Sequence, residues 1–281
     1  MASIYNYFEQ NFGSMGELID FCENTPRAGG WVGENASNDW PSDMTWAMGT
    51  TLATALSMAR FGWPEGREAF VGHMIDAKAT GAAVALQQVT AFHNDVMGIL
   101  VDVGAYMAGA PDNMIMIDEQ AMAPAPVVVL NVGLGYSGET SSKAVHHYGA
   151  AICLLIESLQ LKGHSVEVNM VRHNSKKGDI HSLTVNVKGA NEPMDIDKLA
   201  FALAHPAMLR RIAWRALETV AGAFKNFGWG YGKPLKAPSV NIPSVVSDAG
   251  NFSKACNTMA GACKIVAEIW AAHIQQQQQG G

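Results

Sequence analysis

A glycine-rich loop in the middle of the chain has the residue types and spacing to hold an anion. Gly133, Gly135 and Gly138 form the pattern Gly-x-Gly-x-x-Gly, directly after an apolar run and directly before a helical pattern. In that position, backbone N–H groups and the N-terminus of the helix can point at a phosphate or a carboxylate. Ser137 and Thr140 add hydroxyls that could contact phosphate or a metal ion. The sequence therefore offers a candidate ligand loop over residues 133–140.

Several interpretations of this loop stay open. A dinucleotide site needs an acidic residue about 20 positions later, at the end of the second strand. The second strand expected here ends near Val171-Arg172-His173, without an acid, and the Lys and Thr of a phosphate-binding P-loop are missing in the required order. A generic contact with an anion and a structural turn between strand and helix both fit, and we favour the structural turn.

No group of side chains in the sequence matches a known catalytic arrangement. The segment Gly135-Tyr136-Ser137-Gly138 is one residue short of the Gly-x-Ser-x-Gly nucleophile elbow. The four cysteines form no Cys-x-x-Cys pair, and we expect buried, reduced thiols: Cys22, Cys153, Cys256 and Cys263. We therefore lean against an enzyme and expect no catalytic residues, no metal and no cofactor. The alternative is an enzyme that binds Mg²⁺ or a nucleotide at the loop.

Aromatic and methionine residues in loop-like segments favour a protein interface. Large aromatic side chains bury much area at a low entropy cost, and methionine adapts to surfaces that must repack. The same residues could instead pack over the core of their own chain. The interface candidates are Trp31, Trp40, Trp63, Met107, Met114, Trp229 and Tyr231. They predict a protein partner, self-association or both.

Composition excludes several classes of protein. The 281 residues carry 19 Lys and Arg against 25 Asp and Glu, a net charge of −6, so the chain lacks the basic surplus with which proteins grip nucleic acid. The hydrophobic fraction of 48% and the charged fraction of 16% are the reverse of a disordered chain. Neither a signal peptide nor an apolar run of about 20 residues is visible. We expect a cytoplasmic globular protein that does not bind membranes.

The second half of the chain has the pattern of an α/β unit. Val127–Val132 is a short apolar run, typical of a strand buried on both faces. A helix is expected over Ala144–Leu159, and two alternating segments, Ser165–Val171 and Ile180–Val187, predict a β-hairpin. Asp195 can cap the next helix. The order predicts a Rossmann-like sheet with a parallel strand pair and helices on both faces.

The first half is expected to be mainly helical. Helices are predicted over Met15–Glu23, with Ser14 as the cap, over Thr45–Arg60 and over Pro64–Phe92. A last Ala-rich helix is predicted over Phe252–Ile274. We divide the chain at the Pro/Ala-rich linker Ala121–Pro126. The predicted regions are a tryptophan-containing helical region, 1–126, an α/β domain, 127–274, and a flexible tail, 275–281.

The order of elements after residue 127 resembles the von Willebrand factor A-type domain. In that family the loop after the first strand reads Asp-x-Ser-x-Ser and holds a divalent cation. The matching residues here are Asn131-Val132-Gly133-Leu134-Gly135, so Asn replaces the Asp and glycines replace both serines. Asp248, in Ser247-Asp248-Ala249-Gly250, resembles a second acidic group of the family's site. The resemblance implies the topology and adds Asn131 and Asp248 to the ligand candidates, but it does not carry the metal over.

Two earlier segments resemble an uncharacterised family of tailed-phage proteins. They are Thr45–Gly66, which ends in Gly-Trp-Pro-Glu-Gly, and Gly104–Met114. The resemblance implies a phage or prophage origin, and hence the host cytoplasm, without an activity. Together these observations predict a phage-encoded protein-binding or assembly protein.

Overall fold

The computed structural model describes residues 6–28, 47–81, 83, 93–95, 100–101, 106–107, 109–111, 114–116, 127–136, 140–176, 179–220, 233–234 and 254–279. The linker at residues 121–126, where we placed a boundary between two regions, lies outside them.

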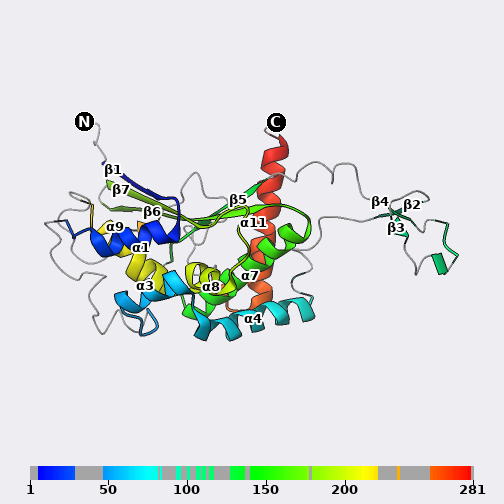
Figure 1. The fold of residues 1–281 in the computed structure, drawn as a ribbon, viewed down its shortest axis with the longest axis horizontal. Coiled ribbons are helices and arrows are strands. Elements are labelled where there is room, and N and C mark those ends of the chain that lie inside the picture. Colours follow the sequence, from blue (N-terminus) through cyan, green and yellow to red (C-terminus); the bar gives the residue numbers. More distant parts are fainter. Residues whose placement is uncertain are drawn as a thin grey trace.

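A mixed β-sheet forms the centre of the fold (Figure 1). Its strand order is β1-β7-β6-β5, with β1 at Tyr7–Phe12, β7 at Asp179–Lys188, β6 at Val166–Lys176 and β5 at Val128–Gly133. β5 runs parallel to β6, β6 antiparallel to β7, and β7 parallel to β1. A short strand, β8 at Lys233–Pro234, also pairs with β6. The protein is thus a mixed α/β protein, as its sequence pattern predicted.

The unit β5-α7-β6-β7 reproduces the order predicted for the second half. Helix α7, Ser142–Leu161, connects the parallel strands β5 and β6, and 14 of its 20 residues are buried. The hairpin is longer than predicted, because β6 continues through Arg172, His173 and Asn174 to Lys176. These polar residues break the apolar alternation that marks a strand in a sequence.

Most of the described helices lie below the sheet in Figure 1, whereas α11 (Met259–Gln279) rises past the sheet toward the C-terminus. We expected helices on both faces of the sheet, and the structure does not confirm that arrangement. Besides α7 and α11, the described helices are α1 (Met15–Asn24), α3 (Leu52–Phe61), α4 (Pro64–Ala79), α8 (Ile196–Ala204) and α9 (Trp214–Leu217), together with a π-helix, η2 (Met208–Ala213).

Several helix ends follow the predicted local signals. The Ser14 side chain accepts a hydrogen bond from the backbone N–H of Glu17, and Asp195 caps α8 through the N–H of Lys198. Gly62, with a φ of +93°, ends α3, because glycine tolerates this left-handed conformation. Pro64 opens α4, where its missing N–H costs no hydrogen bond.

Other helix ends differ from the prediction. The helix expected from Thr45 begins at Leu52, because Thr51 caps it and Met48 has a positive φ of 57°. The helix expected to reach Phe92 ends at Ala79, before Gly81 with a φ of +72°. The last helix begins at Met259 rather than Phe252 and continues to Gln279. For the first two helices, a local backbone conformation sets the helix end against the average helical periodicity of the sequence.

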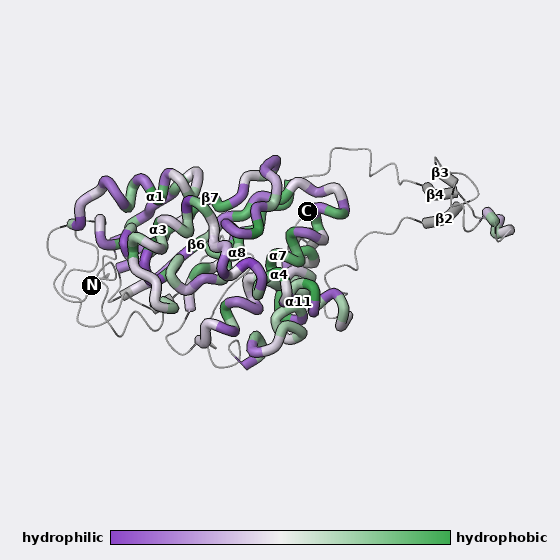
Figure 2. Tube along the Cα trace, turned by 60° about the horizontal axis from the view of Figure 1, so that its bottom comes forward, coloured by the Kyte–Doolittle hydropathy of each residue, from purple (hydrophilic) through white to green (hydrophobic). Residues whose placement is uncertain are grey.

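Elements from both halves of the chain share one hydrophobic core. Leu18 and Ile19 of α1 and Phe70 of α4 belong to the same cluster of buried residues as Leu130 of β5 and Ile152 of α7. Figure 2 shows hydrophobic residues along α7. β1, from the start of the chain, pairs with β7. The first elements and the α/β unit are therefore packed together.

The face of the sheet that points away from the helices carries a ladder of amide side chains. The Nδ2 of Asn169 donates to the Oδ1 of Asn131 at 3.1 Å and to Glu167 at 2.9 Å. The Nδ2 of Asn186 donates to the Oδ1 of Asn169 at 3.0 Å. These bonds join the neighbouring strands β5, β6 and β7 on their polar side.

A second, small antiparallel sheet has the order β2-β4-β3. Its strands are β2 at His93–Asp95, β3 at Leu100–Val101 and β4 at Met114–Met116.

Among the helices that the structure describes, none is long and apolar enough to cross a membrane.

Candidate ligand pocket at the carboxyl end of strand β5

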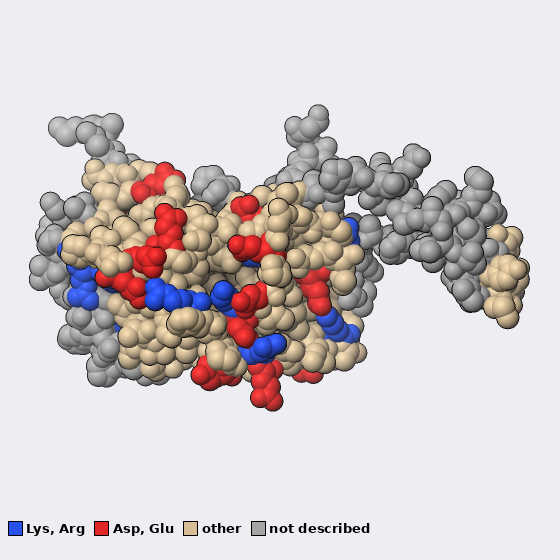
Figure 3. Space-filling model, in the orientation of Figure 1, with Lys and Arg blue, Asp and Glu red and all other residues tan. Residues whose placement is uncertain are grey.

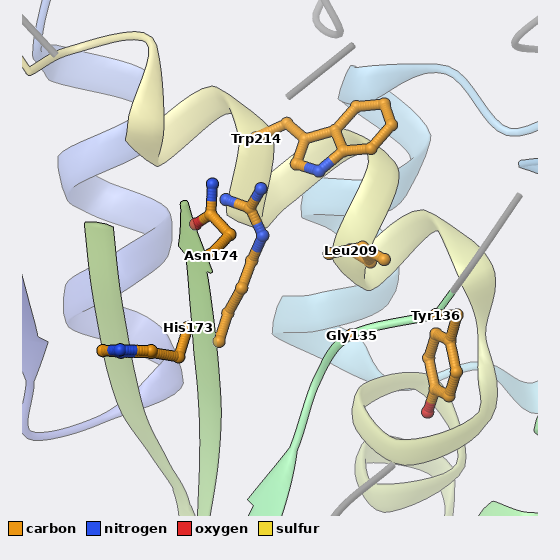
Figure 4. A pocket seen from close by; sticks show the side chains of 7 residues that line it. Gly135, Tyr136, His173, Asn174, Leu209 and Trp214 are labelled. Atoms are coloured by element: carbon orange, nitrogen blue, oxygen red, sulfur yellow. The ribbon is translucent and has the colours of Figure 1, made fainter. Parts of the chain in front are cut away.

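A small pocket lies at the point where β5 leaves the main sheet (Figure 4). Its volume is about 40 Å³. A water molecule needs about 10–15 Å³ on this measure, so the pocket has room for one small group. The described residues that line it are Gly135, Tyr136, Arg172, His173, Asn174, Leu209 and Trp214.

The strand pairing explains the position of the pocket. β5 pairs with β6 as far as Gly133, opposite Val171, and the N–H of Leu134 donates to the carbonyl of Val171 at 2.7 Å. Further along β6, Ser175 and Asn174 pair with β8. The stretch of β6 at Arg172 and His173 therefore lies between the end of one neighbour and the start of another. In α/β proteins, ligands bind outside the carboxyl ends of parallel strands, where such gaps open.

Two polar residues replace apolar ones on the helix-covered side of β6. Val168 and Met170 are buried hydrophobic residues, and the next positions with the same orientation are Arg172 and Asn174. Their exposed fractions are only 5% and 1%. Burying a guanidinium is expensive unless negative or polar groups surround it. The buried polar residues make this end of the strand a candidate site.

The pKa of a neighbouring histidine, His181, is affected by the positive charge of Arg172. His181 on β7 is opposite Asn174, is buried, and its Nε2 lies 2.9 Å from the Oε1 of Gln10. The pKa of His181 is lowered to about 3, mainly by burial and in smaller part by the charges of Arg172 and His173. The imidazole is therefore neutral, and the local cation is the guanidinium.

Helical residues complete the pocket. Leu209 comes from the π-helix η2 and Trp214 from the start of α9. The guanidinium carbon of Arg210 lies 4.8 Å from the ring centroid of Trp214, which is cation–π geometry. In Figure 4, Asn174 extends toward the side of Trp214, whereas the ring of His173 points to the opposite side of the strand. π-Helical turns occur frequently at functional sites.

Tyr136 closes the pocket on the side of the glycine loop. Its hydroxyl donates to the carbonyl of Leu203 on α8 at 3.4 Å. Burial raises the pKa of this phenol above its ordinary value, with a smaller contribution from Cys256. The hydroxyl stays protonated and serves to hold the loop against α8.

The chemistry of the described lining suits an anion rather than a metal. It includes a guanidinium, an amide, an indole, a phenol and a single imidazole, that of His173, and no carboxylate or thiol, so it offers too few ligands for a metal ion. Elsewhere in the described part of the chain, no three His, Cys, Asp or Glu residues come together in a way that could hold a metal ion.

The structure places the predicted loop residues in different surroundings. Gly135 lines the pocket, and Gly133 is the last residue of β5. Asn131 lies within β5 and belongs to the amide ladder on the polar face, not to the pocket. Thr140 is buried. The remaining candidates, Ser137, Gly138 and Asp248, lie outside the described residues.

The N-terminus of α7 is capped by its own chain. The Oγ of Ser141 accepts from the N–H of Ala144 at 3.2 Å and lies 3.4 Å from the Oδ1 of Asn257. One backbone donor that could have held an anion is therefore already satisfied. The structural turn favoured above stays a prediction, because residues 137–139 lie outside the described part of the chain. The described candidate site is the pocket beside this helix end.

The interface candidates also separate in the structure. Trp63 is buried in the core, in contact with His146 and His205. Met107 is exposed, and Met114 is in β4, paired with Val101 and Asp95. Trp31, Trp40, Trp229 and Tyr231 lie outside the described part of the chain.

Sequence reasoning missed the pocket residues Arg172, Asn174 and Trp214. A signal for the first two was present, because they continue the alternation of a strand with polar residues at apolar positions. Trp214 gave no comparable signal, since it is one of several residues in an apolar helical pattern.

Comparison with known proteins gives one match. A family model described as a domain of unknown function (DUF7192) matches residues 2–266. No curated protein and no solved structure matches the chain.

Proposed function

We propose that this chain, which belongs to the family of the DUF7192 domain, works by binding other proteins, including further copies of itself, rather than by catalysis. The observation that carries the proposal is a pair of neighbouring, strongly exposed side chains. Tyr106 is 62% exposed and Met107 is 78% exposed. They lie between β3 and β4 of the small sheet.

Such a pair is suited to a contact surface. An exposed aromatic ring beside an exposed thioether offers apolar area that water solvates poorly, and both residue types are enriched in interfaces. Residues of this kind contribute a large share of binding energy when a partner covers them.

The state of the nucleophiles and bases also favours binding over catalysis. Burial raises the pKa of the thiols of Cys22, Cys153 and Cys256 to about 12 and that of Cys263 to about 11. Thiols in this state are poor nucleophiles at neutral pH. Burial also lowers the pKa of His146 and His205 to about 4, and both imidazoles pack against Trp63.

The surface charge is consistent with a protein partner. On the face shown in Figure 3, basic residues lie beside acidic ones instead of forming one positive patch. A patch of that kind is what a protein uses to bind a nucleic acid backbone.

An origin in a phage, and a place in the host cytoplasm, remain part of this proposal. The functions of the neighbouring genes would test the origin.

Sedimentation velocity of the full chain over a wide concentration range tests self-association. We expect oligomers in the wild type and a dissociation constant at least about tenfold higher in Met107→Ser, equivalent to about 1.4 kcal/mol. Leu161→Ser is the matched control, because Leu161 is also 78% exposed but lies at the end of α7. The control should leave the association unchanged.

Photo-crosslinking tests for a different protein partner. A benzophenone amino acid at position 107 should give a defined crosslinked product in the native cell, and the same residue at position 161 should not. If the wild type stays monomeric and position 107 yields no product, the proposal is overturned.

A further inference from the structure

We propose that the pocket beside Arg172 and Asn174 binds an oxyanion, either a phosphate or a carboxylate group. This site is separate from the protein contact proposed above, and neither proposal depends on the other. Its ligand is a small charged group, which neither the fold nor the family match assigns.

The charge of the described lining points to an anion. Arg172 is the charged side chain among the described residues that line the pocket. A second guanidinium, that of Arg210, lies 4.8 Å from the ring centroid of the lining residue Trp214. Burial lowers the pKa of His181, and the charge of Arg172 lowers it further, so the field of the guanidinium reaches this buried neighbour. In a poorly solvated site this field is stronger than at the surface.

The donors match an oxyanion in type. A guanidinium presents N–H groups in a planar fork that fits the oxygens of a carboxylate or a phosphate. The Asn174 side chain brings an amide with two N–H donors. Gly135 has no side chain, so a ligand can approach the backbone there.

The size of the pocket limits the ligand. A volume of about 40 Å³ suits one phosphate or carboxylate group and is far below the 300–1,000 Å³ of sites that enclose drug-sized molecules. A whole nucleotide would not fit within the described pocket. The proposal therefore differs from the nucleotide site considered from the glycine pattern, since it takes one oxyanion group and uses β6 rather than the loop as its main support.

The position of the pocket supports the same conclusion. It lies where β5 ends and before β8 begins beside β6. Both parallel strands β5 and β6 direct their carboxyl ends there, which is the side of α/β sheets where ligands bind.

Titration of the full chain with inorganic phosphate, and separately with sodium acetate, tests the proposal. Isothermal calorimetry and the thermal midpoint are measured at constant ionic strength, with sodium chloride as the reference. We expect saturable binding of at least one of the two ions and a rise in the midpoint, because a ligand that binds the folded state stabilises it. The stronger ion identifies the source as phosphate or carboxylate.

Two variants with the same chemical change locate the site. Asn174→Asp adds a carboxylate within the pocket and should raise the dissociation constant of the bound ion at least about tenfold. Asn186→Asp makes the same change on the opposite, polar face of the sheet, and it should leave the dissociation constant unchanged. Circular dichroism and urea unfolding of both variants establish that they are folded.

A measurement on the unmodified chain covers the case in which Asn174→Asp fails to fold. In ¹H–¹⁵N NMR spectra, the side-chain signals of Arg172 and Asn174 should shift on addition of the ion. Binding that leaves both signals unmoved, or that persists in a folded Asn174→Asp variant, overturns the proposal. The absence of saturable binding of either ion also overturns it.

Discussion

The indole ring of Trp63 meets the imidazole of His205 edge to face, with 4.6 Å between the ring centroids and an angle of 85°. His146 contacts the same indole at 5.3 Å. Trp63 precedes α4, His146 is in the first turns of α7, and His205 follows α8. One buried tryptophan therefore joins three helices through two histidines, and the stability of this junction depends on the charge of their rings.

Acid should loosen the junction of Trp63, His146 and His205. Burial lowers the pKa of both histidines to about 4, with smaller effects of His73 and His147 on His146 and of His146 on His205. An unfolded histidine titrates near 6.5, so between pH 6.5 and 4 the unfolded chain binds more protons than the folded chain. The free energy of unfolding therefore decreases as the pH is lowered through this range. At about 1.4 kcal/mol per pKa unit, the lowered pKa of each histidine should reduce the free energy of unfolding by on the order of 3 kcal/mol between pH 6.5 and pH 4.

Urea unfolding at intervals from pH 7 to pH 4 measures this loss. His205→Asn removes one titrating ring, and it should reduce the decline of the unfolding free energy over that range. His273→Asn changes a histidine on α11, outside the junction, and should keep the wild-type decline. A wild-type stability that does not change between pH 6.5 and 4.5 would contradict the prediction.

A pair of glycine substitutions should have opposite effects on stability. A Cβ at Gly149 of α7 would lie 2.7 Å from the Cβ of Ala204, so Gly149→Ala should cost about 1–3 kcal/mol by overpacking α7 against α8. A Cβ at Gly72 of α4 would meet nothing within 4 Å, so Gly72→Ala should stabilise the chain by about 0.5–1 kcal/mol through helix propensity. Thermal unfolding of the two variants gives the comparison, and equal shifts would disprove it.

Loss of a buried carboxylate should cost far more than loss of an exposed one. Glu218 is completely buried, and its Oε2 lies 3.1 Å from the Nε of Arg27. Glu218→Gln should destabilise the chain by about 1.5–3 kcal/mol, because it weakens a charge-assisted hydrogen bond to a fully buried carboxylate, whereas the Arg27 side chain is 35% exposed and stays partly hydrated. Asp20→Asn breaks an exposed contact with Arg60 at 3.1 Å and should cost less than about 1 kcal/mol. Chemical denaturation of both variants measures the difference.

The four thiols should be protected from reagents in the folded chain. All four cysteines are buried and free, and burial raises the pKa of each thiol to between about 11 and 12. Ellman's reagent at pH 8 should react with none of them before denaturant is added and with all four afterwards, since the thiolate is the reactive form. Rapid reaction of a thiol in native buffer would show that its segment opens.

Local patterns in the sequence predicted the unit β5-α7-β6-β7 correctly. The apolar run of β5, the apolar stripe of α7 and the alternating hairpin strands lie next to one another in the chain, so each signal is local. The caps at Ser14 and Asp195 were also correct, because a cap depends on residues three positions apart.

Contacts between distant residues were not predicted. β1 has the alternating exposure of an edge strand, but no strand was predicted there, because its partner β7 is more than 160 residues later. The pocket was not predicted for the same reason, because Gly135, Asn174 and Trp214 come from three separate parts of the chain. Sequence reasoning found the loop next to the pocket but not the buried arginine that gives the pocket its charge.

The pairing of β1 with β7 also sets a delay during synthesis. Tyr7 pairs with Ile180, so the first strand leaves the ribosome 173 residues ahead of its partner. At 5–20 residues per second this interval is roughly 10–35 s. During that time Glu9 and Asn11, which alternate with Phe8 and Phe12, would reduce the tendency of the segment to aggregate. The main sheet can therefore take in its first strand only after β7 has been synthesised.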